Sequence, residues 1–173
     1  MNQINIQYHK TKYGEFILGS FEDKLCLLDF RYRKLRAVVD KRLQEGFDAI
    51  FVEQSSDVIQ DSIKQLDEYF NMQRREFDVP IITTGSDFQK KVWKALQEVP
   101  YAKTSTYLDI AIKIGNKKAT KAVASANAAN SIGIIIPCHR IIGSNGELIG
   151  YGGGLAIKKR LLKLEQNLFC AFR

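Results

Sequence analysis

Residues 134–142 read Ile-Ile-Ile-Pro-Cys-His-Arg-Ile-Ile and place three chemically active side chains between two short apolar runs. An uninterrupted apolar run is typical of a buried strand, and Pro137 stops this run because proline has no amide hydrogen to donate. We therefore predict a buried strand over residues 134–136 that ends in a turn carrying the Cys-His-Arg sequence. A chain with this stretch has to fold so that reactive groups are held beside apolar surface.

The Cys-His-Arg sequence contains the groups needed for attack by a thiolate. A cysteine has a reference pKa of about 8.5, so it needs a base near neutral pH. His139 is the candidate base for Cys138, and Arg140 supplies a positive charge that favours the thiolate. Neighbouring residues in an extended segment point to opposite sides, so a bridging water is as plausible as a direct contact. On residue types alone, a small buried cysteine beside a structural histidine fits equally well.

The composition excludes several classes of protein. A chain of 173 residues that is 45% hydrophobic can form one or two small domains with real cores. It has no apolar run of the roughly 20 residues that cross a bilayer and no signal-like start, so we expect a cytoplasmic protein. Cys26, Cys138 and Cys170 contain no CxxC pair, and the only histidines are His9 and His139. We expect neither a disulfide framework nor a metal site.

The net charge of +7 is unevenly distributed along the chain. Residues 1–85 contain 12 Lys and Arg against 14 Asp and Glu, a net charge of −2, whereas residues 86–173 contain 14 against 5, a net charge of +9. A strongly basic second half favours a polyanion such as DNA, because neutralising phosphates releases condensed counterions. The alternative is a basic face that only keeps the protein in solution.

The first half has the pattern of a small α/β domain and no catalytic spacing. Alternating apolar residues predict strands, and apolar residues at helical spacing predict helices, the second with Ser56 as its N-cap. We place a first domain at residues 1–80, a linker at residues 81–85 and a second domain at residues 86–173. The expected elements of the first domain are strands at 4–8, 16–20, 25–30 and 49–52 and helices at 35–46 and 58–70.

The second half predicts a helix-turn-helix. Ser86 and Gln89 fit a capping box that opens a helix, which Pro100 ends. A polar turn then leads into a helix over residues 108–114 that stops at Gly115, and a third helix follows at about residues 117–129. In such motifs the second helix of the pair usually enters a groove of DNA.

This third helix is built from small residues with lysines near its start. Ala122 and six further alanine or serine side chains allow a close approach to another surface, and Lys117, Lys118 and Lys121 suit phosphates. We expect the helix to approach DNA closely. Tight packing against another helix is the alternative explanation of the same composition.

The sequence Pro-Cys-His-Arg, followed by Gly-Tyr-Gly-Gly at residues 150–153, resembles the active-site signature of the O6-alkylguanine-DNA alkyltransferases. This family is also called the methylated-DNA–protein-cysteine methyltransferases. The similarity extends from about Gly85 to Glu165, and its motifs occur in the order and spacing of the family. It implies a ribonuclease-H-like α/β domain followed by a mainly helical domain with a helix-turn-helix.

The resemblance implies one reaction and a set of catalytic residues. Cys138 would accept the alkyl group of O6-alkylguanine irreversibly and stoichiometrically, with no cofactor, and O4-alkylthymine stays open as a second substrate. His139 and Glu165 would complete a relay from Cys138 through water, in the manner of a nucleophile, a base and an orienting acid. Asn130 matches the hinge asparagine that ties the recognition helix to the active-site turn, although Ser131 replaces the usual proline.

The resemblance also implies the residues that would bind double-stranded DNA containing the lesion. Tyr107 matches a tyrosine that helps to rotate the nucleotide, and Tyr151 and Gly152 match residues beside the extruded guanine. Lys121 stands where the family has an arginine finger, and we expect weaker base extrusion because lysine lacks a planar guanidinium. Further expected DNA contacts are Arg140, Ala122, Lys117 and Lys118.

Two other functions remain open from the sequence. A non-catalytic protein that recognises alkylated DNA could use the same fold, although it would not need a thiol at Cys138. A cysteine hydrolase acting on a small substrate would leave the basic second half unexplained. We expect a monomeric DNA-repair protein of the alkyltransferase class.

Overall fold

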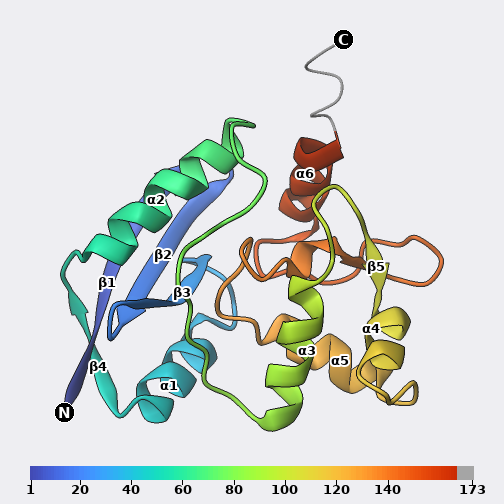
Figure 1. Ribbon diagram of the computed structural model, residues 1–173, viewed down its shortest axis with the longest axis horizontal. Helices are drawn as coiled ribbons and strands as arrows, with labels where there is room; N and C mark the ends of the chain where they lie inside the picture. Colours follow the sequence, from blue (N-terminus) through green and yellow to red (C-terminus); the bar gives the residue numbers. More distant parts are fainter. Residues whose placement is uncertain (167–173) are drawn as a thin grey trace. The chain divides into compact units, whose positions relative to one another are not determined.

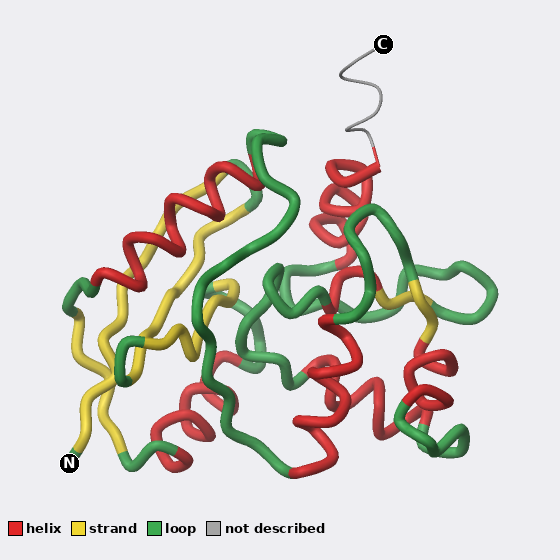
Figure 2. The backbone as a smooth tube through the Cα atoms, in the orientation of Figure 1, coloured by secondary structure: helices red, strands yellow, loops and turns green. Residues whose placement is uncertain are grey.

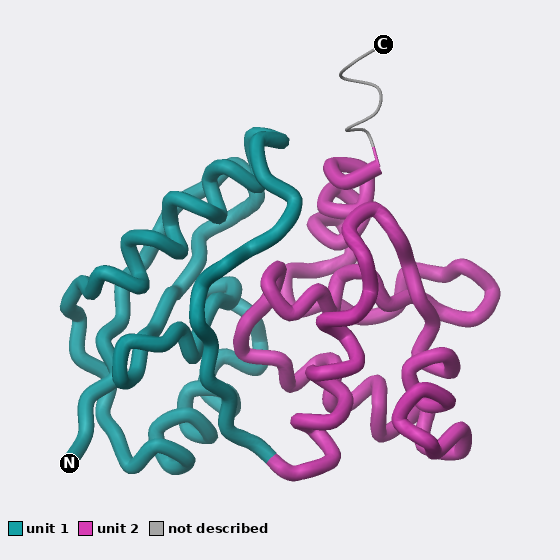
Figure 3. The backbone as a smooth tube through the Cα atoms, viewed as in Figure 1, with its two compact units in different colours: residues 1–85 teal, residues 86–173 magenta. Residues whose placement is uncertain are grey.

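The computed structural model describes residues 1–166. The chain divides into two compact units, Met1–Gly85 and Ser86–Arg173, which Figure 3 shows in different colours. The first unit is built around a β-sheet, and the second is mainly helical with long connecting loops (Figures 1 and 2).

The sheet of the first unit has the strand order β3-β2-β1-β4. The strands β1, β2 and β3 form an antiparallel meander, and β4 pairs parallel with β1. A parallel pair needs a crossover connection, and α1 provides it between β3 and β4. The elements are β1 (Asn2–Thr11), β2 (Gly14–Phe21), β3 (Lys24–Phe30), α1 (Arg36–Gly46), β4 (Ala49–Glu53) and α2 (Asp57–Phe70).

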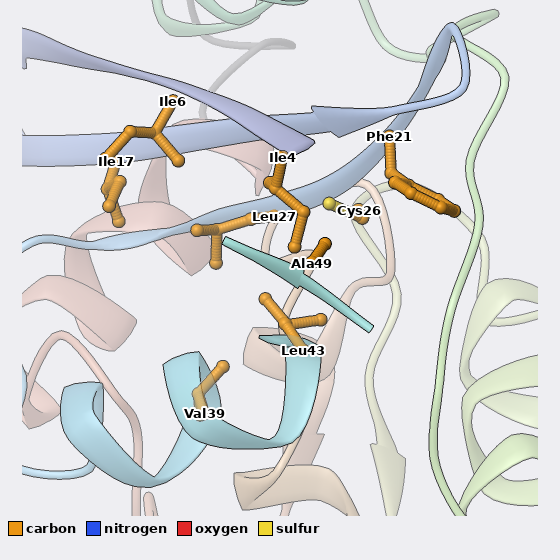
Figure 4. Packing of buried hydrophobic residues seen from close by; sticks show 9 residues of the cluster. All are labelled: Ile4, Ile6, Ile17, Phe21, Cys26, Leu27, Val39, Leu43 and Ala49. Carbon is orange, nitrogen blue, oxygen red and sulfur yellow. The ribbon is translucent and has the colours of Figure 1, made fainter. Parts of the chain in front are cut away.

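Both faces of this sheet are covered by apolar contacts. On one face, Leu43 of α1 lies in a buried cluster with Ile4 and Leu27 (Figure 4). On strand β2, Phe16 packs against Phe70 of α2, with their ring centroids 5.9 Å apart. The expected α/β architecture of this half is confirmed, and Ser56 caps α2 through the amide of Ile59.

Residues 80–82, at the end of the first unit, pair with the edge of the sheet and do not form a free linker. The amide of Leu25 donates to the carbonyl of Pro80 at 2.8 Å, and the amide of Ile82 donates to the carbonyl of Leu25 at 2.9 Å. Because β3 is an edge strand, its main-chain groups need partners, and the chain at residues 80–82 supplies them. Ile81 and Ile82, expected within the linker, therefore lie beside the sheet.

The second unit begins with the helix that the capping box predicts. Ser86 accepts from the amide of Gln89, and the Gln89 side chain accepts from the amide of Ser86. A second capping box, formed by Thr106 and Asp109, opens α4. The elements are α3 (Asp87–Gln97), β5 (Ser105–Thr106), α4 (Tyr107–Lys113), α5 (Thr120–Ala128), the 3-10 turn η1 (Cys138–Arg140), β6 (Ile141–Ile142) and α6 (Leu155–Gln166).

The pair α4 and α5 forms the expected helix-turn-helix, but α5 starts later than predicted. Gly115 ends the first helix with a φ of 83°, a conformation that glycine adopts without strain. The amide of Ala119 donates to the carbonyl of Asn116 at 3.0 Å, which closes a turn before the helix. Lys117 and Lys118 therefore lie in the connecting turn and not in the helix.

The strand predicted over residues 134–136 is wrong. These residues form a turn, in which Ile134 has a φ of 69° and the amide of Ile136 donates to the carbonyl of Ile132 at 3.0 Å. The apolar run is buried as expected, because Ile134 and Ile136 are 2% and 0% exposed. An apolar run alone cannot distinguish a buried strand from a buried turn.

Candidate active site

Cys138 lies at the start of η1, directly after Pro137 and before the short strand β6. Strand β6 pairs parallel with β5, the two residues that precede α4, so the sheet fixes the turn beside the helix-turn-helix. The Cys138 side chain is nearly buried, since the residue is 8% exposed.

A turn held by Asn130 delivers the chain to Cys138. The Asn130 side chain donates to the carbonyl of Ile136 at 2.8 Å and accepts from the amide of Ile132 at 3.0 Å. Asn130 itself is 3% exposed, so these bonds form in a dry environment where they are strong. The side chain of Asn130, the expected hinge residue, therefore bonds to both ends of the turn.

Glu165 is the centre of a buried hydrogen-bond network. Its carboxylate lies 2.7 Å from Nε2 of His139 and accepts from Nε and Nη2 of Arg140 at 2.9 and 3.0 Å. The amide of Ala102 donates to the same carboxylate at 3.1 Å. Helix α6 is thereby joined to η1 and to the segment after α3.

The network fixes the charges of its members. Burial alone would raise the pKa of Glu165, but hydrogen bonds from His139 and Arg140 and the positive charge of Arg140 lower it to about 2. Burial lowers the pKa of His139 below its usual 6.5, against the opposing effect of Glu165. An ionised carboxylate accepts only, so a neutral His139 has its hydrogen on Nε2 and a lone pair on Nδ1. Within residues 1–166, no hydrogen bond to this buried Nδ1 is found.

Arg140, which the sequence analysis expects to contact DNA, is buried. The residue is 7% exposed, and besides Glu165 its guanidinium donates to the carbonyl of Val99 at 2.8 Å and faces the ring of Tyr101. Its planar donors bind the carboxylate through two parallel hydrogen bonds, which a lysine could not do. The structure thus places Arg140 in the buried hydrogen-bond network around Glu165.

The glycine-rich loop between β6 and α6 lies beside Tyr107. The hydroxyl of Tyr107 donates to the carbonyl of Ile149 at 2.8 Å, and burial raises its pKa. Gly150, with a φ of 57°, allows the loop to turn where a larger residue would be strained. Tyr151 and Gly152, both half-buried, follow in the same loop. The structure therefore brings these three predicted substrate residues, Tyr107, Tyr151 and Gly152, into one neighbourhood.

The exposed face of helix α5 carries a lysine and small residues. Lys121, Ala122, Ser125 and Ala128 are exposed, whereas Val123 and Ala126 are buried. The opposite face is held to α3, where Nε1 of Trp93 donates to the carbonyl of Ala126 at 2.8 Å. Lys117 and Lys118 are also exposed, in the turn that precedes the helix.

Lys158 is a buried residue of this neighbourhood that the sequence analysis missed. It lies on α6, is 0% exposed, and donates to main-chain carbonyls of β6 and of the glycine-rich loop. The helical spacing indicates this burial. Leu161 and Glu165 follow Lys158 by three and seven positions, so all three residues lie on one face of the helix. No group of His, Cys, Asp and Glu in the described part of the chain could hold a metal ion.

The chain is similar to known proteins over nearly all of its length. The 6-O-methylguanine DNA methyltransferase, ribonuclease-like domain matches residues 4–83, and the DNA binding domain of the same name matches residues 87–167. The methylated-DNA–protein-cysteine methyltransferase of Methanosarcina barkeri is 45% identical over 154 residues, which cover 89% of this chain and 92% of that protein. The chain belongs to the 6-O-methylguanine DNA methyltransferase family.

Other members of the methyltransferase family agree with this assignment. The methylated-DNA–protein-cysteine methyltransferase of Methanosarcina acetivorans is 50% identical over 152 residues, covering 88% of this chain and 92% of its own. A crystal structure of Mycobacterium tuberculosis OGT in complex with DNA has a TM-score of 0.80 at 34% identity, covering 96% of this chain and 94% of that chain. The mixed fold expected from the sequence, a ribonuclease-like α/β half and a helical half, is confirmed.

No helix in residues 1–166 of this family member is long and apolar enough to span a membrane.

The buried histidine and carboxylate predict that acid destabilises this methyltransferase. The pKa of His139 is below 6.5 in the native state, and that of Glu165 is about 2 against a usual 4.5. In both cases the unfolded chain binds protons that the native state does not, so stability is full above about pH 6.5 and falls as the pH falls. Thermal denaturation should give lower Tm values from about pH 7 to about pH 5, with a flatter dependence in His139→Gln. A wild-type Tm that is constant over this range would contradict the assigned charges.

Proposed function

We propose that this protein repairs DNA by transferring the alkyl group of O6-alkylguanine to Cys138, once and irreversibly. The observation that carries the proposal is a buried thiol and a neutral histidine that are neighbours on η1, with an ionised glutamate of α6 bonded to the histidine. A protein that only recognised alkylated DNA would have no use for a base and an orienting acid beside a cysteine.

The proton of the thiol has a route to a base. Nε2 of His139 is bonded to Glu165, so Nδ1 is the nitrogen available to take the Cys138 proton through a bridging water. The thiolate then attacks the alkyl carbon, a carbon–sulfur bond forms, and the bond from that carbon to guanine O6 breaks. Guanine leaves with the electron pair and takes up the proton that Cys138 gave, so that normal guanine is restored.

The product explains why no turnover is expected. A thioester can be hydrolysed because its carbonyl carbon is electrophilic, whereas the S-alkyl Cys138 thioether has no such carbon. Each molecule therefore acts once, the damaged DNA is the alkyl donor, and the reaction requires no cofactor. Its substrate places the reaction inside the cell, where genomic DNA is found.

DNA binding is assigned to the second unit, which carries the excess positive charge. We propose that the open face of α5 approaches the duplex closely through Ala122, with Lys117 and Lys118 at phosphates. The reactive guanine O6 lies inside the duplex, so the nucleotide has to be flipped out, at a cost of roughly a few kcal/mol. Lys121 would support the flipped state, and Tyr107, Tyr151 and Gly152 would receive the base.

Intact-protein and peptide mass spectrometry tests the reaction. After incubation with a duplex containing one O6-methylguanine, a single methyl group is expected on the peptide that contains Cys138, saturating at one per protein. Cys138→Ala should bind the duplex and remain unmodified. If the wild-type protein binds the duplex but stays unmodified, the protein is a damage-recognition protein and not a transferase.

Lys121 provides a prediction about the efficiency of base flipping. A guanidinium stacks on a base step where an ammonium does not, a difference of about 0.5–1 kcal/mol at an exposed site. Lys121→Arg should therefore raise the single-turnover rate of methyl transfer about two- to fivefold, and Lys121→Ala should lower it. The rate is measured at saturating duplex, with Lys90→Arg on α3 as the matched control. An unchanged rate in both Lys121 variants would remove this residue from the flipping step.

A further inference from the structure

A segment rich in arginine connects β3 to the first turns of α1 in the first unit. Residues 31–42 contain six Lys and Arg against one Asp, a net charge of +5, whereas residues 1–85 together have a net charge of −2. An exposed run of charges is usually only solvated, but Arg33, Arg36 and Arg42 are half-buried. Their guanidinium groups therefore need partners other than bulk water.

Arg36, at the start of α1, is held between two carboxylates. It stands three and seven positions before Val39 and Leu43, which belong to the buried cluster of Figure 4, so it lies on the same face of the helix. Its Nη1 donates to Oδ2 of Asp29 at 2.8 Å, and its Nε donates to Oδ1 of Asp40 at 2.8 Å. Within residues 1–166, no hydrogen bond is found for its buried Nη2. One nitrogen of a charged group is thus left without an acceptor, which costs free energy.

Three guanidinium groups lie near the carboxylates of Asp29 and Asp40. Arg33 also donates to Oδ2 of Asp29, at 3.0 Å, so this one oxygen serves two arginines. Burial lowers the pKa of Arg42, and the positive charges of Arg33 and Arg36 lower it further. The cluster therefore has more positive than negative charge, and a further anion would relieve the repulsion among its arginines.

The start of α1 also has the features that favour an anion. Its N-cap residue, Leu35, has no side-chain acceptor, and no acidic residue lies in its first turn. Helices α2, α3 and α4 instead begin with a capping side chain and an acidic residue. The amides of a first turn carry the positive end of the helix dipole, and Arg36 adds its charge there. A helix start of this kind can bind an anion through its main-chain amides.

We propose that Arg33, Arg36 and Arg42 form, with the first turn of α1, a binding site for a phosphate group. The planar donors of a guanidinium bind two phosphate oxygens at once, and the remaining oxygens can accept from the amides of the turn. A carboxylate has only two oxygens and could not satisfy both sets of donors. Ala37 and Val38 are exposed, so the turn is open to a ligand. The site is made by the first unit alone, and the inference does not depend on methyl transfer by the second.

Nuclear magnetic resonance of the full chain tests the site with inorganic phosphate as the probe. We expect saturable shifts of the Ala37 and Val38 amide signals and of the Arg36 Nε signal on addition of phosphate. Chloride at equal ionic strength should produce no such shifts, because screening by salt does not require a site. Equal shifts with both salts would overturn the proposal.

Variants of the arginines link the shifts to the cluster. Arg36→Gln should weaken phosphate binding at least about tenfold, through loss of a charge-assisted hydrogen bond. Because Arg36→Gln also breaks two ion pairs and can impair folding, Arg42→Gln is the second test, and it should weaken binding about threefold or more. Lys41→Gln, the matched control, removes an exposed charge of the same helix and should change the affinity less than about twofold. Wild-type affinity in a folded Arg36→Gln or Arg42→Gln protein would overturn the proposal.

Asp40→Asn tests the same site through a gain of affinity. Asp40 competes with the ligand for Arg36, so removal of its charge should raise the affinity for phosphate about threefold. If the arginines served stability alone, this variant would lose an ion pair and gain no affinity. An affinity that is unchanged or lower in Asp40→Asn would therefore contradict the site.

An undamaged duplex and deoxyguanosine monophosphate identify the source of the phosphate group. If DNA occupies the site, the duplex should shift the same α1 signals, and Arg36→Gln should reduce the salt slope of duplex binding by about one. If a free phosphate compound occupies it, the monophosphate should shift these signals and the duplex should not. Either result supports a phosphate site, whereas the absence of shifts with inorganic phosphate, monophosphate and duplex alike would overturn it.

Discussion

The buried carboxylate of Glu165 makes the hydrogen bonds on which the arrangement around Cys138 depends. It is fully buried, and it is bonded to His139, to both donors of the Arg140 fork and to the amide of Ala102. Such an ion is tolerable only because every bond is made, since an unpaired buried charge costs several kcal/mol. The same bonds select the His139 tautomer and join α6 to the reactive turn. The packing around Cys138 and the chemistry proposed for Cys138 therefore depend on the same group.

The two buried cations, Arg140 and Lys158, have different kinds of partner. Arg140 is matched by Glu165 and stiffens the framework, whereas Lys158 has main-chain carbonyls of β6 and of the glycine-rich loop as its partners. Main-chain oxygens hold an ammonium in place without cancelling its charge. The two cations therefore hold different parts of the second unit together.

The sequence predicted the features that local rules determine. The capping box of Ser86 and Gln89, the glycine that ends α4 and the alternating strands of the first unit all depend on neighbouring residues and are confirmed. The isoleucine run was predicted wrongly as a strand, because its turn depends on the Asn130 side chain, which bonds to residues two and six positions ahead. The burial of Arg140 and Lys158 depends on contacts with residues as far as 41 and 17 positions away, which no local pattern encodes.

The single-turnover rate of methyl transfer by Glu165→Gln tests the central claim most directly. The glutamine amide has nearly the same shape, but it neither neutralises Arg140 nor holds His139 as a carboxylate does. At saturating O6-methylguanine duplex the rate should fall at least about a hundredfold, as expected when a base loses its orienting acid. A folded Glu165→Gln protein that transfers the methyl group at the wild-type rate would contradict the account.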